Sequence, residues 1–236
     1  RVARGQSRQG GWGMSAIVSP GFSLGEKVGR LLGIAGGRAG TTLGPEEATE
    51  VFLKALYTKS PMTAQHSERV AGYAVALGLA LDLPWAQVRH LERCGLLHDM
   101  GKIGVEESIL AKPGALSDEE WQSVRTHPDL GVQVVGSCPV LEDVLPAVAY
   151  HHERLDGKGY PYGIGGDDLP LDVRIITICD AYDSMTADRP YRRGMPVAEA
   201  VRRLVEGAGT QFDPELVNLF VAQVVPNLPG GTMKAS

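Results

Sequence analysis

Apolar residues recur at helical spacing along most of the chain. Between residues 46 and 58 they fall three or four positions apart, at Ala48, Val51, Phe52, Ala55 and Leu56, which is the spacing of one helix face. The same spacing predicts further helices over 62–80, 84–98, 171–187, 196–208 and 213–224. Only the apolar run 173–178 is ambiguous between strand and helix. The pattern therefore predicts an all-α body.

Local signals indicate where several helices begin. Pro45, followed by two glutamates, is typical of a first helical turn. Ser117 with Glu120 three residues later forms a capping box, and Pro128 and Pro139 also stand at helix starts. By contrast, residues 153–170 contain five glycines and two prolines, so we expect a structured loop there.

Glycine is unevenly distributed. Twelve of the 30 glycines lie in residues 1–44, where six basic residues and one acid give a local charge of +5. We therefore predict a flexible, basic linker over 1–44, with at most a weak helix at 24–34. One domain follows over 45–226, and a disordered tail over 227–236. Because the total charge is −5, the remainder carries about −10, which disfavours a nucleic-acid polymer as partner.

Other classes of protein are excluded by what the chain lacks. It has no run of 18 apolar residues that could span a membrane. The first apolar stretch is broken by glycines and Pro20, which does not fit a secretory signal, and the start at Arg1 suggests a part of a longer protein. Cys94, Cys138 and Cys179 are far apart in apolar surroundings, so we expect reduced core thiols and a cytoplasmic protein.

Histidine carries the strongest chemical signal. Of six histidines, His90 lies among charged helical residues and is interpreted as a solvated surface side chain. The other five are His66, His98, His127, His151 and His152. A single histidine is more often a hydrogen-bonded core or surface residue than a ligand. Here, however, His98 precedes Asp99, two histidines are adjacent, and Asp180 lies in an apolar string where an unpaired charge is costly.

A metal cation is the partner that explains both the carboxylates and the histidines. Imidazole and carboxylate ligands without thiolate favour Fe, Mn, Co, Ni or Zn, and enough ligands are present for two ions. Two ions bridged by a carboxylate and a hydroxide are a general device for in-line attack on phosphorus. The residues therefore predict hydrolysis of a phosphate ester.

Five strings make the chain resemble an HD-GYP domain, a subgroup of the HD phosphohydrolases that hydrolyses cyclic di-GMP. They are HSERV (66–70), HDMGKIG (98–104), THPDLG (126–131), HHERLDGKGYP (151–161) and DAYDSMTADRPYR (180–192). A bare HD dipeptide would mean little, but all five occur in the family's order and spacing over about 46–224. The resemblance implies an HD-type helical bundle with a single catalytic domain.

The resemblance also implies a role for each matching residue. His66, His98, Asp99 and Asp180 correspond to the ligands of one metal. Asp99 is also the bridge to a second metal, which His127, His151 and His152 hold. Asp99 and Lys102 correspond to the catalytic residues of the family. The resemblance implies that the positive charge of Lys102 lies near the scissile phosphate.

Further positions correspond to substrate contacts. Arg189 and Arg192 match residues that hold the ligand's phosphates, and arginine adds the capacity for a two-pronged hydrogen bond. Tyr160 lies in the loop that corresponds to the substrate-side lid, although packing of that loop onto the body explains it equally well. Some members have a glutamate four residues before the first histidine for a third metal, but here Met62 stands there, so we expect two metals. Asp183 is predicted to orient a ligand from behind.

The leading hypothesis is a metal-dependent phosphodiesterase in which a hydroxide bridging two divalent metals, first of all Fe or Mn and otherwise Ni, Co or Zn, attacks cyclic di-GMP. The products are pGpG and, after a second round, GMP. An HD phosphohydrolase for another nucleotide and a non-catalytic cyclic di-GMP receptor are the alternatives. The expected partners are the cyclic dinucleotide and an upstream sensor or receiver domain; a homodimer is left open.

Overall fold

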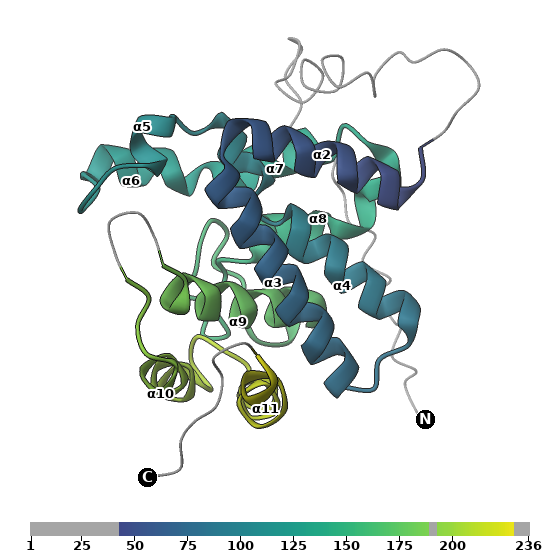
Figure 1. Cartoon of the computed structure of the whole chain (residues 1–236), viewed down its shortest axis with the longest axis vertical. Helices are drawn as coiled ribbons and strands as arrows, with labels where there is room; N and C mark the ends of the chain where they lie inside the picture. Colours follow the sequence, from purple (N-terminus) through teal and green to yellow (C-terminus); the bar gives the residue numbers. More distant parts are fainter. Residues whose placement is uncertain (1–42, 189–192, 229–236) are drawn as a thin grey trace, which may run out of the picture.

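A computed structural model describes residues 43–188 and 193–228 of the chain, and these form a bundle of helices (Figure 1). Its longer helices are α2 (Pro45–Lys59), α3 (Pro61–Ala80), α4 (Trp85–Leu97), α6 (Asp118–Arg125), α7 (His127–Val135), α9 (Leu171–Thr186) and α10 (Val197–Gly207). Shorter turns are η1 (Met100–Gly104), α5 (Glu107–Leu110), η2 (Pro139–Val144), α8 (Leu145–Tyr150), η3 (Gly166–Asp168), α11 (Pro214–Leu219), η4 (Phe220–Val224) and η5 (Val225–Asn227). The described residues contain no strand, only an isolated bridge between Ala208 and Phe212, so the all-α prediction is confirmed.

The predicted helix starts agree with the local chemistry. The Ser117 hydroxyl accepts a hydrogen bond from the Glu120 backbone N–H, and the Glu120 carboxylate accepts one from Ser117, which completes the capping box. Proline begins α2 and η2 and stands at the second position of α7. The ambiguous run 173–178 lies inside α9 and is buried, which explains its continuous apolar character.

Two boundaries differ from the periodicity. The helix predicted over 84–98 ends at Leu97, so that His98 caps it and Asp99 lies in the turn before η1. The segment 213–224 begins as α11 and continues as the wider turn η4. The glycine-rich loop 153–170 is confirmed, with one short turn, η3, inside it.

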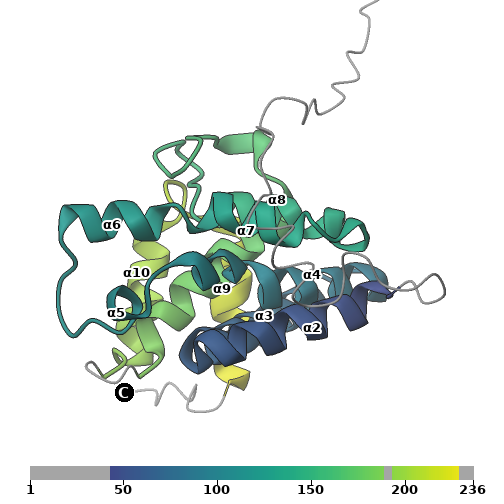
Figure 2. The same cartoon turned by 90° about the horizontal axis from the view of Figure 1, so that it is seen from above.

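Helix α3 is at the centre of the packing. It lies against α2, α4 and α9, as Figure 2 shows from above. A Cβ atom at Gly95 would lie 2.5 Å from the Ala71 Cα, so glycine permits α3 and α4 to approach closely. This contact brings the first histidine of the chain, on α3, beside His98 at the end of α4. The three cysteines are free and buried, as predicted.

Some predictions fall on residues that the structure does not describe. These are nearly all of the linker 1–44 with its weak helix 24–34, Arg189 and Arg192, and residues 229–236 of the tail. Asn227, where the tail was predicted to begin, is the last residue of η5. Among the described helices, none combines the length and the apolar character needed to cross a membrane.

Candidate metal centre

Five of the predicted ligands lie at helix ends, and two, His66 and Asp180, lie within helices. The seven are His66 in α3, His98 and Asp99 after α4, His127 at the start of α7, His151 and His152 after α8, and Asp180 in α9. Adjacent residues of a regular helix point about 100° apart, so the breaks after α4 and α8 permit each neighbouring pair to face one region. Five helices and the turns between them therefore converge on one point.

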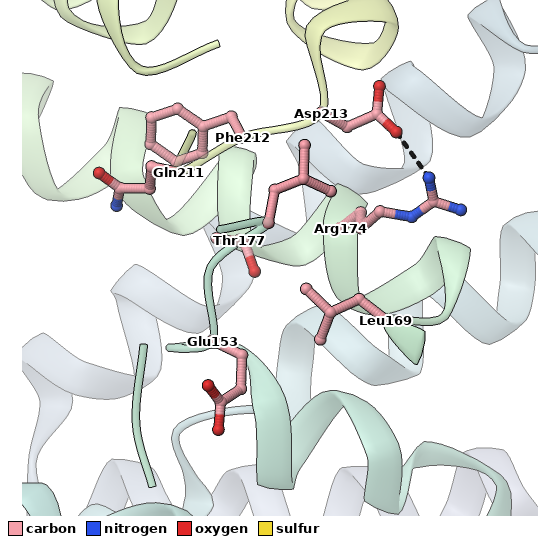
Figure 3. A pocket seen from close by; sticks show the side chains of 8 residues that line it. Glu153, Leu169, Arg174, Thr177, Gln211, Phe212 and Asp213 are labelled. Atoms are coloured by element: carbon pink, nitrogen blue, oxygen red, sulfur yellow. Dashed lines mark hydrogen bonds and ion pairs between the residues drawn. The ribbon is translucent and has the colours of Figure 1, made fainter. Parts of the chain in front are cut away.

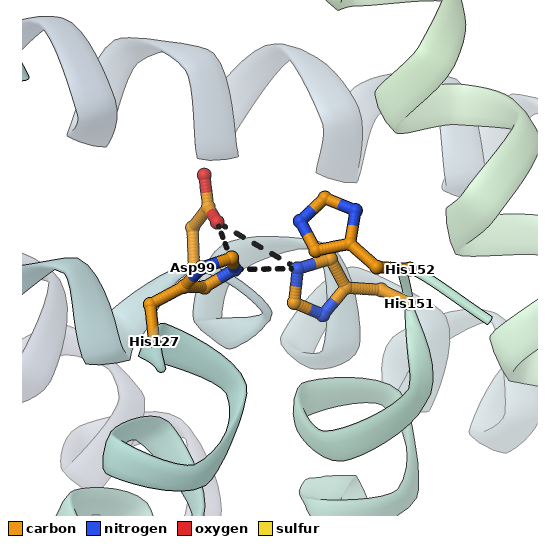
Figure 4. Close-up of side chains that lie close together, drawn as sticks. All are labelled: Asp99, His127, His151 and His152. Atoms are coloured by element: carbon orange, nitrogen blue, oxygen red, sulfur yellow. Dashed lines mark hydrogen bonds and ion pairs between the residues drawn. The ribbon is translucent and has the colours of Figure 1, made fainter. Parts of the chain in front are cut away.

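The seven side chains form two groups of ligand atoms. His66, His98 and Asp180 make the first ligand group; Asp99, His127, His151 and His152 make the second (Figure 4). Within each group every ligand atom lies within 4.8 Å of the others. All seven predicted ligands are thus brought together.

Asp99, a member of the second group, also borders the first, and each of its two carboxylate oxygens faces a different group. Its Oδ1 is 3.3 Å from the His127 Nε2 and 3.7 Å from the His151 Nε2. Its Oδ2 is 3.5 Å from the His66 Nε2 and 3.6 Å from the His98 Nε2. This is the arrangement that a carboxylate bridging two cations requires.

Backbone carbonyls fix the orientation of three imidazoles. The Nδ1 of His98 donates to the Gly95 carbonyl at 2.8 Å, that of His127 to the Val124 carbonyl at 2.7 Å, and that of His151 to the Val148 carbonyl at 3.0 Å. A carbonyl only accepts, so each Nδ1 carries the proton and each Nε2 keeps its lone pair. The lone pairs point inward.

Several of these inward atoms lack a donor. The Nε2 atoms of His127 and His151 face each other at 3.0 Å, although both have given their proton to the other ring nitrogen. The His98 Nε2 and the Asp99 Oδ1 are buried without a hydrogen bond. Buried lone pairs are costly unless something electropositive is near, and a divalent cation with nitrogen and oxygen ligands meets that need. The residues therefore fit a pair of metal ions.

Burial keeps most of these histidines neutral. It lowers the pKa of His127 to about 3 and that of His152 to about 4, and it also lowers those of His98 and His151. Neutral imidazole is the form that binds metal. These four imidazoles are therefore available at neutral pH without loss of a proton.

His66 differs because carboxylates surround it. Burial alone would lower its pKa, but hydrogen bonds with Asp180 and Asp183 and the charge of Asp99 outweigh this effect and raise it to about 9. Its Nδ1 donates to the Asp183 Oδ2 at 2.7 Å. Arg69 holds the same carboxylate with two bonds, at 2.7 and 2.9 Å. Asp183 therefore lies behind His66, where it fixes the ring and leaves Nε2 toward the first ligand group.

A pH titration of the metal-free protein checks these opposite shifts. From about pH 4 to 6.5 the unfolded chain binds protons that folded His127 and His152 refuse, so the free energy of unfolding should rise with pH, by about 3 kcal/mol from His152 alone. From 6.5 to 9 folded His66 holds a proton that the unfolded chain releases, so stability should fall. Urea unfolding of chelator-treated protein should therefore show a maximum near pH 6.5. A steady rise through pH 9 would contradict the role given to His66.

Lys102 lies at the edge of the centre. Its Nζ is 2.5 Å from the Asp99 Oδ2, and its side chain is 22% exposed, whereas that of Asp99 is buried. Burial opposes ionisation of Asp99, but the positive charge of Lys102, together with that of protonated His66, holds the pKa of Asp99 well below the usual value. The lysine thus connects the buried carboxylate with the solvent-facing side.

The loop 153–170 covers the second ligand group. The Tyr160 ring stacks on His152, with centroids 4.7 Å apart, and the Arg125 guanidinium lies 5.0 Å from the Tyr160 centroid. Tyr160 thus packs on one of the predicted ligands and on Arg125.

Glu153 is a buried acid that sequence reasoning did not single out. Its Oε1 accepts hydrogen bonds from the Tyr162 and Gly163 backbone N–H groups, at 2.6 and 3.0 Å. On its other side it lines a small pocket with Thr177 and Phe212 (Figure 3). Arg69 and Arg125 were missed as well, since only tertiary contact reveals what they hold; Arg69 did have a signal, three residues after His66 on one helix face.

Comparison with known proteins agrees with this geometry. The family model described as HD domain matches residues 50–216. The chain belongs to the HD-domain family. Within this family, the predicted resemblance to HD-GYP domains is confirmed by the relatives that the chain matches.

Two curated relatives are each 42% identical to this HD-domain chain. One is the cyclic di-GMP phosphodiesterase PA4108 of Pseudomonas aeruginosa, over 170 residues, 72% of this chain and 41% of the relative. The other is 3'3'-cGAMP-specific phosphodiesterase 3 of Vibrio cholerae, over 164 residues, 70% of this chain and 36% of the relative. A crystal structure of a cyclic GMP-AMP specific phosphodiesterase of V. cholerae, V-cGAP3, aligns with a TM-score of 0.52 and 35% identity over 78% of this chain and 42% of that one. The chain thus spans less than half the length of these relatives.

Proposed function

We propose that this HD domain is a metal-dependent phosphodiesterase that hydrolyses cyclic di-GMP to pGpG and, in a second round, to GMP. The observation that carries the proposal is the position of Asp99, with one carboxylate oxygen toward each of two ligand groups. Two divalent cations held there would neutralise charge on the phosphoryl oxygens and make water a better nucleophile near neutral pH. Relatives named for cyclic di-GMP hydrolysis support the choice of substrate.

The roles of the chain's own residues follow from their contacts. His66, His98 and Asp180 would hold one cation and the second ligand group the other, and Asp99 faces both groups. Asp183 and Arg69 keep the His66 ring in place. Water attacks phosphorus in line with the 3′ oxygen, the bond from phosphorus to that oxygen breaks, and the linear dinucleotide results.

Lys102 is placed to follow the developing negative charge. In the described structure its ammonium pairs with Asp99, and its partial exposure permits the side chain to turn toward a phosphoryl oxygen. We propose that Arg189 and Arg192 bind the phosphate that is not being cleaved. Tyr160 is proposed to contact the substrate from the loop 153–170. Two-pronged hydrogen bonding suits both arginines for that task.

The wider setting of the domain is also part of the proposal. We assign residues 45–226 to catalysis and 1–44 to a linker that joins an upstream sensor or receiver domain. The two native metal ions are proposed to be iron or manganese, because histidine and carboxylate ligands bind both elements. The three free buried cysteines support a reducing, cytoplasmic location.

A second substrate has specific support. Three curated relatives carry names that specify 3'3'-cGAMP, and one solved structure is also named for cyclic GMP-AMP. A non-catalytic receptor is less well supported, since every predicted ligand is present and they lie together.

A substrate panel tests the proposal. Metal-reconstituted protein is incubated with cyclic di-GMP, 3'3'-cGAMP, cyclic di-AMP and a mononucleotide ester, and products are followed by chromatography. We expect pGpG from cyclic di-GMP at the highest kcat/KM. Faster turnover of cGAMP would replace the substrate but keep the reaction, whereas tight binding of every dinucleotide without any product would favour the receptor.

Replacing Lys102 isolates its contribution. Lys102→Met keeps most of the side-chain length but removes the charge, so kcat should fall about 10²- to 10³-fold while two metals stay bound. Steady-state kinetics with metal analysis of the same sample checks both parts. Lys158→Met, at an exposed lysine of the neighbouring loop, is the matched control. An unchanged kcat for Lys102→Met would remove the lysine from the mechanism.

A further inference from the structure

A third group of ligand atoms lies outside the candidate metal centre. His90 and Cys94 are four residues apart on α4, and Asp172 is in the first turn of α9. The sequence interpretation of His90 as a solvated surface residue is wrong. Its side chain is only 24% exposed and bonds to two carboxylates. The hydrophobic pattern gave no sign of this, because Asp143 and Asp172 come from distant segments.

The three atoms have the dimensions of a metal site. The His90 Nε2 is 3.0 Å from the Asp172 Oδ2 and 3.4 Å from the Cys94 Sγ, and Sγ is 4.0 Å from Oδ2. Zinc binds nitrogen and oxygen at about 2.0–2.2 Å and sulfur at about 2.3 Å in tetrahedral geometry, which places ligand atoms roughly 3.3–3.6 Å apart. The observed triangle fits around such an ion with shifts of a few tenths of an ångström.

Surrounding groups hold these side chains in ligand orientation. The second ring nitrogen of His90, Nδ1, lies 3.0 Å from the Asp143 Oδ2, and Arg93 fixes that carboxylate at 2.7 Å. A carboxylate behind a histidine is the usual support of a metal ligand, because it fixes the tautomer with Nε2 free. The Asp172 Oδ1 accepts from the Val173 backbone N–H at 2.9 Å, which leaves Oδ2 for the group.

Access and charge also suit a cation. Cys94 is fully buried, while the side chains of His90 and Asp172 are 24% and 17% exposed, so the site opens to solvent on one side. A thiolate and a carboxylate would balance the charge of one divalent ion. Binding would displace the thiol proton of Cys94, whose pKa burial raises in the absence of metal.

We propose that His90, Cys94 and Asp172 bind a divalent transition metal of the zinc type, with Asp143 supporting His90 and solvent completing the coordination. The site is separate from the candidate metal centre, and within residues 43–188 and 193–228 it is the only group of potential metal ligands that includes a cysteine. It joins α4, which leads into His98, to α9, which carries Asp180. Occupancy therefore stabilises the packing of the two helices that deliver ligands to the candidate metal centre.

The rival explanation needs no metal. A protonated His90 between Asp143 and Asp172 is an ion-pair network, and Arg93, Arg89 and Glu46 extend it across the surface. Hydrogen bonding to Asp172, against the effect of burial, raises the pKa of His90 in that state. In the network Cys94 stays a thiol, so the bonding state of its sulfur separates the two explanations.

Cobalt substitution detects directly whether the Cys94 sulfur is bound to a metal. Reduced, chelator-treated protein is titrated with Co²⁺ alone, and near-ultraviolet absorption is recorded. A thiolate-to-cobalt charge-transfer band should appear, and its final intensity should correspond to one thiolate-bound Co²⁺ per chain. The band should disappear on addition of Zn²⁺. The candidate metal centre binds through nitrogen and oxygen, so its cobalt cannot produce this band.

Variants locate the band and complete the test. Cys94→Ser should abolish it, Cys138→Ser, at another buried thiol, should leave it, and Asp99→Asn should leave it although the other centre is damaged. Asp143→Asn should weaken Co²⁺ binding at the band-forming site about 10- to 100-fold.

If Cys94→Ser does not fold, His90→Ala and Asp172→Asn replace it, and both should abolish or greatly weaken the band. Absence of the band in the parent protein, or its persistence in all three ligand variants, would overturn the proposal. Neither outcome bears on turnover of cyclic dinucleotides, so the two proposals fail separately.

Discussion

Asp99→Asn is expected to lower turnover of cyclic di-GMP by more than about 10³-fold and to release bound metal. The side chain is buried, and its two oxygens face the two ligand groups. The amide keeps the shape but loses the negative charge and one of the two acceptor oxygens, so it cannot bridge two cations. Metal analysis and chromatography of one preparation should show both losses together.

Two controls make the result for Asp99 specific. Asp168→Asn makes the same chemical change at an exposed position of the loop and should leave turnover and metal content unchanged. The far-ultraviolet circular dichroism of Asp99→Asn should remain that of the parent protein, because the asparagine fits the same space. Parental activity with full metal content would show that Asp99 does not bridge.

The candidate ligands could be chosen from the sequence because their chemistry is local. His98 beside Asp99, the pair of histidines before a glycine loop, and Asp180 in an apolar string each violate the ordinary burial pattern. The helical periodicity predicted the segments that carry them. Family resemblance then divided them into two metal sites, and the geometry agrees with that division.

What the sequence could not supply depends on tertiary contact. The spacing places Arg69 on the same helix face as His66, but only the fold reveals its partner, Asp183, which is 114 residues away. His90 looked solvated for the same reason: Asp143 and Asp172 approach it from other elements. The tautomers of His98 and its partners likewise depend on which carbonyls lie behind the rings. The candidate ligands can therefore be chosen from local sequence, whereas the orientation of their side chains depends on the fold.

Orientation depends in turn on one close backbone contact, which Gly101→Ala should break. Gly101 lies in η1, two residues after Asp99, and a Cβ atom there would be 1.8 Å from the His127 carbonyl oxygen and 2.5 Å from the Gly131 backbone nitrogen. Both obstructing atoms belong to the backbone of α7 and have no rotamer to change. Either η1 and α7 separate or the domain loses stability, and we expect more than about 3 kcal/mol in urea unfolding at neutral pH.

The matched control for Gly101→Ala is Gly72→Ala in α3, where nothing lies within 4 Å of the added atom. That variant should be more stable than the parent, by about 0.5–1 kcal/mol, because alanine favours the helix. Gly101→Ala should also bind metal more weakly, since separation of η1 from α7 moves Asp99 away from His127. Opposite changes in the free energy of unfolding for the two variants would show that the short distance between Asp99 and His127 depends on the absence of a side chain at Gly101. Equal, small effects would show instead that the α7 backbone yields, and that the metal ligands tolerate its movement.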